Sequence, residues 1–276
     1  MYTLNCKGKL LTLDKPLVMG IINATPNSFY NQYAQKGFEA IIELADKIIS
    51  EGAAIIDIGG QSTQPGSERI NAEEEIQRVL PVIEKLIKKY PEIILSIDTY
   101  HSKVAIAAVN AGVVIVNDVS AGNMDNEMLQ TVADLNVPYI CMHMKGTPEN
   151  MQQHAAYDDV VKEVLDFFIN KIADCKKAGI KDIIIDPGFG FGKTIAHNFI
   201  LLKNLEAFKM LDKPIMAGLS RKATVYKTLN TTADKALNGT TVLNTIALLN
   251  GATILRVHDV KEAKETITLL DSYKNL

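Results

Sequence analysis

The sequence predicts a (β/α)8 (TIM) barrel, and three observations support this fold class. The chain has 276 residues, close to the length of about 250 that is typical of such a barrel. Apolar runs that suit buried strands alternate with helical patterns, which indicates a parallel sheet. Eight such strand–helix units follow one another, and eight units favour closure into a barrel. An open doubly wound sheet is the alternative, but it usually has fewer strands and a glycine-rich first turn.

A short polar-apolar segment precedes the first unit. Residues 1–14 read MYTLNCKGKLLTLD and predict a short strand or hairpin that covers the bottom of the barrel. Neither a linker nor a low-complexity segment interrupts the units that follow. We therefore expect residues 1–276 to form a single domain.

The expected strands are runs of mostly apolar residues, as in VMGIIN at 18–23, which suit strands buried on both faces. They fall at residues 16–23, 53–60, 92–99, 113–120, 137–144, 182–188, 213–220 and 252–259. Each is followed by a segment with helical periodicity. The expected helices fall at residues 37–53, 71–90, 102–112, 126–136, 157–179, 196–211, 238–251 and 260–273.

Composition and charge exclude several classes of function. The formal net charge is −3, and a lysine-rich stretch such as EKLIKKY reads as a solvated helix face, so we expect no nucleic-acid surface. No apolar run reaches the ~18 residues of a membrane span, and the N-terminus lacks a signal-peptide pattern. Cys6, Cys141 and Cys175 form no C-x-x-C pair, so neither a zinc site nor a disulfide framework is indicated. A cytoplasmic protein without membrane contact is the expectation.

Every expected strand ends on a polar or ionisable side chain. In chain order these are Asn23, Asp57, Asp98, Asn117, His143, Asp186, Ser220 and Arg256 with His258. Such residues also cap helices in ordinary turns. Their recurrence at all of the strand ends favours a ring of site residues instead, because active sites of these barrels lie where the carboxyl ends of the strands meet the loops.

The ring contains two classes of group. Asp98, Asn117 and Asp186 suit a neutral heterocycle that has adjacent N–H donors and ring acceptors, and Met142 and Phe191 could contact its flat faces. The basic side chains lie after the seventh and eighth strands, where this fold often binds phosphate. They are Arg221, Lys222, Arg256 and His258. The pattern predicts a polar heterocycle that carries an anionic group.

The segment PGFGFGKT at 187–194 resembles a phosphate-binding loop only in part. Pro187 stands where the G-x-x-x-x-G-K-[ST] pattern requires its first glycine, so the match fails. We expect Lys193 to be structural.

Taken together, the motifs at the strand ends resemble those of the dihydropteroate synthase family, whose members are pterin-binding barrels of folate synthesis. The matching segments occur in the family's order, one at each strand end. They are GIINATPNSF, IIDIGGQSTQPG, SIDTYHSKVA, VNDVSAG, MHMKGTP, IIDPGFGFGKT, GLSRKA and RVHDV. Each segment alone is a weak signal, whereas the ordered set covers nearly the whole chain and is specific.

The resemblance implies an activity and its partners. The expected reaction condenses 6-hydroxymethyl-7,8-dihydropterin diphosphate with p-aminobenzoate and yields 7,8-dihydropteroate and diphosphate. The expected cofactor is Mg²⁺, and the expected assembly is a homodimer.

The resemblance also implies roles for individual residues. The pterin would be held by Asp98, Asn117, Met142, Asp186, Phe191 and Lys222. The diphosphate would be bound by Asn23, Thr63, Arg256 and His258, with Asn23 also a ligand of Mg²⁺. The p-aminobenzoate pocket would comprise Phe29, Thr63, Pro65, Phe191, Ser220 and Lys222. Asp98, Lys222, Arg256 and His258 would carry the catalysis.

Two loop positions depart from the family pattern. The first loop reads TPNSF where the family has T-P-D-S-F, and the second reads STQPG where it has S-T-R-P-G. Asn27 and Gln64 thus replace an aspartate and an arginine that are thought to pair when the loops close. The two amides can still bond to each other, and Arg69 is a candidate for the missing positive charge.

Two alternative functions stay open. A methyltetrahydrofolate-binding methyltransferase domain shares the barrel but would not need the Arg256–His258 diphosphate motif. A non-catalytic pterin-binding paralogue is compatible with the changes at Asn27 and Gln64.

Overall fold

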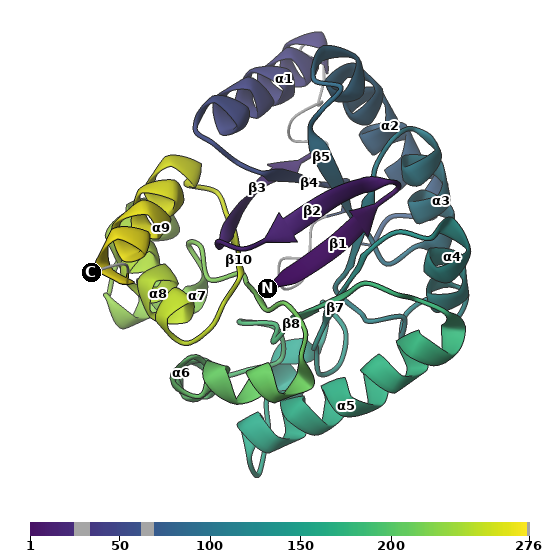
Figure 1. Cartoon of the computed structure of the whole chain (residues 1–276). Coiled ribbons are helices and arrows are strands. Elements are labelled where there is room, and N and C mark those ends of the chain that lie inside the picture. Colours follow the sequence, from purple (N-terminus) through teal and green to yellow (C-terminus); the bar gives the residue numbers. More distant parts are fainter. Residues whose placement is uncertain (25–33, 62–68, 275–276) are drawn as a thin grey trace.

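The computed structural model describes residues 1–24, 34–61 and 69–274. Within these residues an eight-stranded sheet has the order β8-β7-β6-β5-β4-β3-β10-β9, and all of its pairings are parallel. A parallel bridge between Ile185 and Ile215 joins its two outer strands. The ribbon forms a ring of strands enclosed by helices (Figure 1). The prediction of a (β/α)8 barrel is confirmed.

The barrel strands lie close to the expected positions. They are β3 (Leu17–Asn23), β4 (Ile55–Gly59), β5 (Ile94–Asp98), β6 (Ile115–Asp118), β7 (Tyr139–Met142), β8 (Ile183–Asp186), β9 (Met216–Ala217) and β10 (Ile254–Val257). Most of their residues are buried on both faces of the sheet, as the continuous apolar runs indicate.

The helices follow the strands in alternation. They are α1 (Ala34–Ser50), α2 (Ala72–Lys89), α3 (Ser102–Asn110), α4 (Met128–Leu135), α5 (Val160–Ala178), α6 (Ile195–Lys203), α7 (Ala223–Thr228), α8 (Leu237–Leu249) and α9 (Val260–Lys274). Short 3-10 turns occur at η2 (Met151–His154), η3 (Leu205–Leu211) and η4 (Ala233–Lys235). None of the described helices has the length and apolarity that crossing a membrane would require.

Two details differ from the sequence prediction. The helix expected at 196–211 ends at Lys203 and continues as η3. At this end both the backbone N–H and the side chain of Asn204 donate to the Ile200 carbonyl oxygen, at 3.1 and 2.8 Å, a local bond that asparagine offers at helix ends. The short helix α7 was not expected. Its six residues are too few to produce a detectable period.

The N-terminal segment forms the expected hairpin, in which β1 (Tyr2–Cys6) pairs antiparallel with β2 (Lys9–Leu13). It lies across the end of the barrel where the strands begin (Figure 1). Leu4, Cys6 and Leu13 are buried against the first inward-facing residues of the barrel strands. Those residues are Met19, Ile55, Ile115, Ile140, Ile184, Met216 and Ile254. The hairpin therefore closes the bottom of the barrel with an apolar plug.

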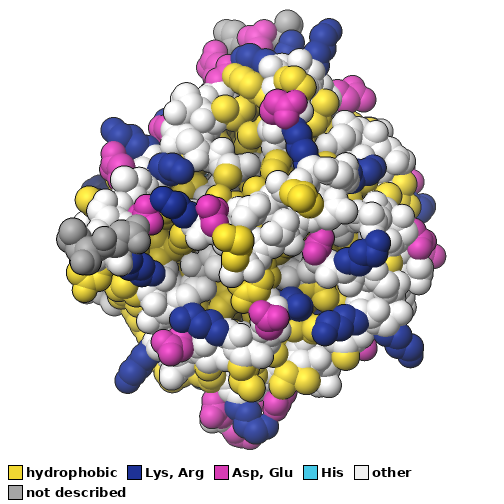
Figure 2. Space-filling model, viewed as in Figure 1, with side chains coloured by type: hydrophobic (Ala, Val, Ile, Leu, Met, Phe, Trp, Pro, Cys, Tyr) yellow, Lys and Arg dark blue, Asp and Glu magenta, His cyan; other side chains and the backbone are white. Residues whose placement is uncertain are grey.

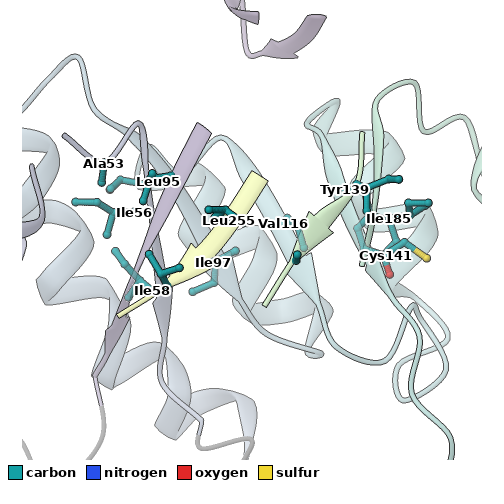
Figure 3. Close-up of a cluster of buried hydrophobic side chains, with 14 of the residues drawn as sticks. Ala53, Ile56, Ile58, Leu95, Ile97, Val116, Tyr139, Cys141, Ile185 and Leu255 are labelled. Atoms are coloured by element: carbon teal, nitrogen blue, oxygen red, sulfur yellow. The ribbon is translucent and has the colours of Figure 1, made fainter. Parts of the chain in front are cut away.

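The alternation of side chains along each strand separates the core from the site. Ile56 and Ile58 of β4, with Leu95 and Ile97 of β5, belong to the main core against the helices (Figure 3). Asp57 lies between the two isoleucines and so points the opposite way, into the barrel. The apolar positions thus hold the helices, and the positions between them line the interior.

Candidate active site

Four polar side chains above the apolar plug are joined by direct bonds. Arg256 donates from Nε to Asp57 Oδ2 at 2.6 Å and from Nη2 to Asp98 Oδ2 at 2.5 Å. Asn117 Nδ2 donates to the same Asp57 oxygen at 2.8 Å. These residues come from β4, β5, β6 and β10. The structure therefore brings Asp98 and Asn117 together, as the ring of strand ends predicts. It also joins Arg256, which was assigned to the separate diphosphate group, directly to the carboxylates of Asp57 and Asp98.

The Asp98 carboxyl can change protonation near neutral pH. Its burial raises its pKa to about 7, with a further rise from the negative charge of Asp57, while the Arg256 guanidinium acts in the opposite direction. Such a carboxyl can be tuned by a ligand, because a hydrogen-bond donor favours its ionised form.

Asp57 has a role in the site that the sequence did not predict, although the residue lies at one of the expected strand ends. It is completely buried and accepts from both Arg256 and Asn117. The only signal for this role was its position at a strand end, because the partner Arg256 lies far away in the sequence.

Asp186 and Lys222 form a second part of the site beside the first. Asp186 Oδ1 accepts the Gly188 N–H at 2.8 Å. Burial raises the pKa of Asp186, and the charge of Lys222 opposes this rise. Lys222 Nζ donates to the Phe189 carbonyl oxygen at 2.5 Å and lies 4.7 Å from the centroid of the Phe191 ring. Burial lowers the pKa of Lys222 to about 8, against the attraction of Asp186.

An apolar cluster provides flat and flexible surface at this site. Met142 and Phe191 belong to it, together with Tyr100, Val119, Met144 and Met151. Both Met142 and Phe191 are buried, and Phe191 contacts the cation of Lys222. The two residues expected to contact a heterocycle are therefore grouped beside the polar set.

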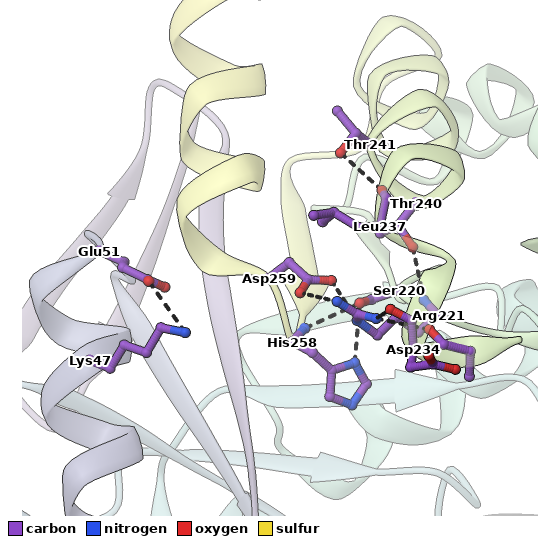
Figure 4. A network of polar contacts seen from close by, with 11 residues as sticks. Lys47, Glu51, Ser220, Arg221, Asp234, Leu237, Thr240, Thr241, His258 and Asp259 are labelled. Atoms are coloured by element: carbon purple, nitrogen blue, oxygen red, sulfur yellow. Dashed lines mark hydrogen bonds and ion pairs between the residues drawn. The ribbon is translucent and has the colours of Figure 1, made fainter.

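Ser220 and His258 are joined by a pair of contacts (Figure 4). Ser220 Oγ lies 3.1 Å from His258 Nδ1 and accepts the His258 N–H at 3.2 Å. Desolvation lowers the pKa of His258 to about 4, and the positive charge of Arg256 adds to this effect. His258 is therefore neutral at pH 7, although the residue keeps an exposed surface.

Arg221 was expected in the basic group of the site, but the structure places it elsewhere. Its guanidinium makes a two-pronged contact with Asp259, at 2.9 and 2.8 Å, and Nη1 donates to the carbonyl oxygens of Ala233 and Asp234 (Figure 4). Because an arginine fork engaged in this way has few donors left, Arg221 holds the loop between α7 and α8 against the start of α9.

His143 is also outside the ring. Lys193 Nζ lies 2.8 Å from His143 Nδ1, and the ring packs edge-on against Phe167. Lys193 is buried and donates to the carbonyl oxygens of His143, Gly188 and Phe191. The prediction that Lys193 is structural is confirmed, whereas the inclusion of His143 in a ring of eight was wrong.

Several predicted site residues lie outside the described part of the chain. They are Phe29, Thr63 and Pro65, together with the loop positions Asn27 and Gln64. Arg69, the candidate for the missing charge, is described, and its Nε lies 2.9 Å from Glu149 Oε1. Asn23 is exposed at the end of β3.

Comparisons with known proteins identify the family of this chain. Residues 19–258 match the family model described as "Pterin binding enzyme". The dihydropteroate synthase of Escherichia coli K12 is 39% identical over 268 residues, which cover 96% of this chain and 94% of that protein.

Solved structures agree equally well. The structure of Xanthomonas albilineans dihydropteroate synthase with 4-aminobenzoic acid has a TM-score of 0.93 and 40% identity, and covers 99% of this chain and 98% of that chain. The same enzyme in complex with 7,8-dihydropteroate has a TM-score of 0.89 and 38% identity, with 100% of both chains covered. The chain therefore belongs to the pterin binding enzyme family and, within it, to the dihydropteroate synthases.

Proposed function

We propose that the chain condenses 6-hydroxymethyl-7,8-dihydropterin diphosphate with p-aminobenzoate to give 7,8-dihydropteroate and diphosphate. The observation that carries the proposal is the bonded set of Asp57, Asp98, Asn117 and Arg256 above the apolar plug. It stands at the carboxyl ends of the strands, where barrel enzymes place their active sites.

The pterin edge is matched by the carboxylates and the amide of the site. A dihydropterin presents adjacent N–H donors, which Asp98 and Asp186 accept, and Asn117 can both donate and accept. Lys222 supplies a donor for a ring acceptor from the Asp186 side. Met142 and Phe191 supply the contacts to the flat faces.

The diphosphate requires groups that stabilise negative charge as it departs. Arg256 is a permanent cation, and His258 is a neutral imidazole that an anion can induce to take up a proton. Asn23 at the end of β3 adds an amide, and Thr63 is proposed as a further contact. Charge stabilisation of this kind is the main way in which a site promotes the loss of an anionic leaving group.

Mg²⁺ fits the groups that the site offers. This ion prefers oxygen ligands and often binds through one or two protein side chains, with substrate phosphates and water completing its shell. Asn23 offers such an oxygen, exposed beside Gly59 of β4. Among the described residues no cluster of three or more His, Cys, Asp or Glu side chains could hold a metal. When bound, Mg²⁺ would neutralise part of the charge on the diphosphate.

The role of Asn23 can be tested by calorimetry. The variant Asn23→Ala should bind Mg²⁺–diphosphate more weakly than wild type, and its binding of pteroic acid should be unchanged.

The reaction breaks the bond between the pterin methylene carbon and the diphosphate oxygen, and forms a bond from that carbon to the arylamine nitrogen. Asp98 and Asp186 stabilise the positive charge that spreads over the pterin as the diphosphate departs. Phe191, Ser220 and Lys222 are proposed for the p-aminobenzoate pocket, together with Phe29, Thr63 and Pro65, which lie outside the described residues. The amine is already nucleophilic, so a strong base is not required, and the proton lost from nitrogen can pass to water.

Product formation from the two purified substrates and Mg²⁺ tests this function. We expect 7,8-dihydropteroate and one equivalent of diphosphate, measured by chromatography and a phosphate assay. Pterin binding without any product would favour a non-catalytic paralogue. Methyl transfer from methyltetrahydrofolate would favour the methyltransferase alternative, which the intact Arg256 and His258 set does not support.

We also propose a homodimer in the cytoplasm. Ile195 and Ile200 on α6, with Val242 and Leu249 on α8, are exposed apolar side chains that a second copy could cover. The three cysteines are free and buried, which suits a reducing compartment. Sedimentation analysis that finds only monomers at micromolar concentration would contradict the dimer.

A further inference from the structure

A buried carboxyl lies directly behind the pterin site. Glu75 is on the first turn of α2 and is completely buried. Its Oε2 accepts a hydrogen bond from Thr99 Oγ1 at 3.0 Å, and its Oε1 has no hydrogen-bond partner among the described residues. None of the roles proposed above uses this group.

The surroundings of Glu75 favour the neutral acid. A carboxylate that is buried with a single hydrogen bond is strongly destabilised. Arg78, whose positive charge opposes the rise in the Glu75 pKa, is already engaged, because it donates to the Gly60 carbonyl oxygen at 2.9 Å and to Glu74 Oε1 at 2.5 Å. In agreement, burial raises the pKa of Glu75 to about 8, and the charge of Asp98 adds to the rise.

Glu75 also braces the ends of two strands that carry the site. Thr99 follows Asp98 directly, its N–H donates to the Asn117 carbonyl oxygen at 3.0 Å, and its hydroxyl accepts the His101 N–H at 3.1 Å. On the other side, a Cβ placed on Gly60 would lie only 2.9 Å from Glu75 Cγ. The Glu75 side chain therefore fills the space between the turns that leave β4 and β5.

We propose that Glu75 is a positioning residue for Asp98, acting through the hydroxyl of Thr99. This inference rests on the proposed function, because it assumes that Asp98 binds the pterin. In its neutral form the Glu75 carboxyl holds the turn after Asp98 in place without adding a second negative charge behind the site. Since Asp98 lies close enough to influence it, ionisation of Glu75 should in turn disturb Asp98.

The proposal predicts a pH effect on pterin affinity. The titratable and charged groups that face Glu75 in the described chain are Asp98 from β5, Arg78 on α2 itself, and Tyr100 in the turn before α3. Above about pH 8, Glu75 loses its proton and its charge repels Asp98. Pterin binding should then weaken.

The test is calorimetric titration of pteroic acid into wild type, Glu75→Gln and Glu75→Leu between pH 6.5 and 9.5. Glutamine has the shape of the neutral acid and cannot ionise. At pH 6.5 we expect wild type and Glu75→Gln to have the same dissociation constant for pteroic acid. At pH 9.5 the dissociation constant of wild type should be larger than that of Glu75→Gln by about fivefold or more, a typical size for coupling between two sites. The ratio cancels the titration of Lys222 and of the ligand, which both proteins share. Glu75→Leu should bind more weakly throughout.

The proposal would be overturned if the ratio of the two dissociation constants, wild type over Glu75→Gln, did not change with pH. It would also be overturned if Glu75→Gln lost as much affinity at pH 6.5 as Glu75→Leu.

Should the Glu75 variants fail to fold, Thr99→Val serves as the second variant. It interrupts the same contact and should weaken pteroic acid binding, whereas Thr99→Ser should restore it. If wild type did not bind pteroic acid at any pH, the proposed function itself would be refuted. If wild type bound pteroic acid but the ratio did not change with pH, only the role of Glu75 would be refuted.

Thermal unfolding gives an independent readout of the protonation state. A carboxyl whose pKa is raised by folding contributes stability at low pH that is lost as the pH rises towards its folded pKa. The melting temperature of Glu75→Gln should therefore rise relative to wild type between pH 5 and 8. A difference that does not change with pH would contradict a neutral buried acid.

Discussion

At the scale of single residues, the site depends on charges that neutralise one another inside the barrel. Arg256 reaches two carboxylates at once, and its side chain is 19% exposed while that of Asp57 is 0% exposed. Breaking such a buried pair leaves an uncompensated charge, which is costly. Burial leaves Asp98 with a pKa of about 7, so that a ligand bound beside this carboxyl can shift its protonation.

Asp98→Asn should weaken the binding of pteroic acid. The amide keeps the shape of the side chain but loses the charge that faces Arg256 and the second acceptor that faces the pterin. We expect a loss of about 1–3 kcal/mol, measured by calorimetry. Asp182→Asn is the matched control, because Asp182 bonds to the Asn5 N–H at the bottom of the barrel. Equal losses in both variants would mean that Asp98 does not contact the pterin.

His258 should take up a proton when diphosphate binds. Its pKa of about 4 in the free protein leaves it neutral at pH 6, and a bound anion raises that pKa. Calorimetry in buffers with different ionisation enthalpies measures the number of protons exchanged. We expect wild type to take up more protons per diphosphate than His258→Gln, with a difference of up to about one proton. Identical proton counts would show that His258 does not sense the diphosphate.

At the scale of elements, the hairpin of β1 and β2 contributes stability at the end of the barrel opposite the site. Leu4 is 2% exposed beneath the strands, whereas Leu10 on the same hairpin is 72% exposed. The face that carries the hairpin shows acidic and basic side chains interspersed, without a large area of one sign (Figure 2).

Leu4→Ala should lower the free energy of unfolding by about 2–5 kcal/mol through the cavity that it leaves, with the Michaelis constants unchanged. Leu10→Ala is the matched control and should have almost no effect. Denaturant unfolding measures the first quantity and steady-state kinetics the second. A comparable loss of stability in both variants would contradict the plug.

The positions of these elements could be predicted because each strand and helix produces a local pattern in the sequence. The bonds inside the site could not be predicted in the same way. Arg256 and Asp57 are 199 residues apart, and only closure of the barrel brings them together. His143 follows the last residue of β7, on the same outward-facing side as Tyr139 and Cys141, where it contacts Lys193 and Phe167 rather than the barrel interior.

At the scale of the whole molecule, the barrel separates stability from chemistry along its axis. An apolar layer with the hairpin closes one end. On β4, β6, β8 and β10 the next inward-facing position is polar, at Asp57, Asn117, Asp186 and Arg256, whereas on β7 it is the apolar Met142. The helices hold the outward-facing positions of the same strands. The proposed pterin site is thus built on the strands, and substitutions at the plug and at the site should have separable effects.

The structure of this chain with 7,8-dihydropteroate bound is the most direct test of where the pterin is held. We expect the edge of the pterin to lie on Asp98, Asn117 and Asp186, with its flat faces against Met142 and Phe191. Electron density for the ring outside the barrel mouth would contradict this site. Density for the pterin in the groove beside α1 and α9, which is lined by Ser50, Lys261 and Leu269, would refute the proposed site.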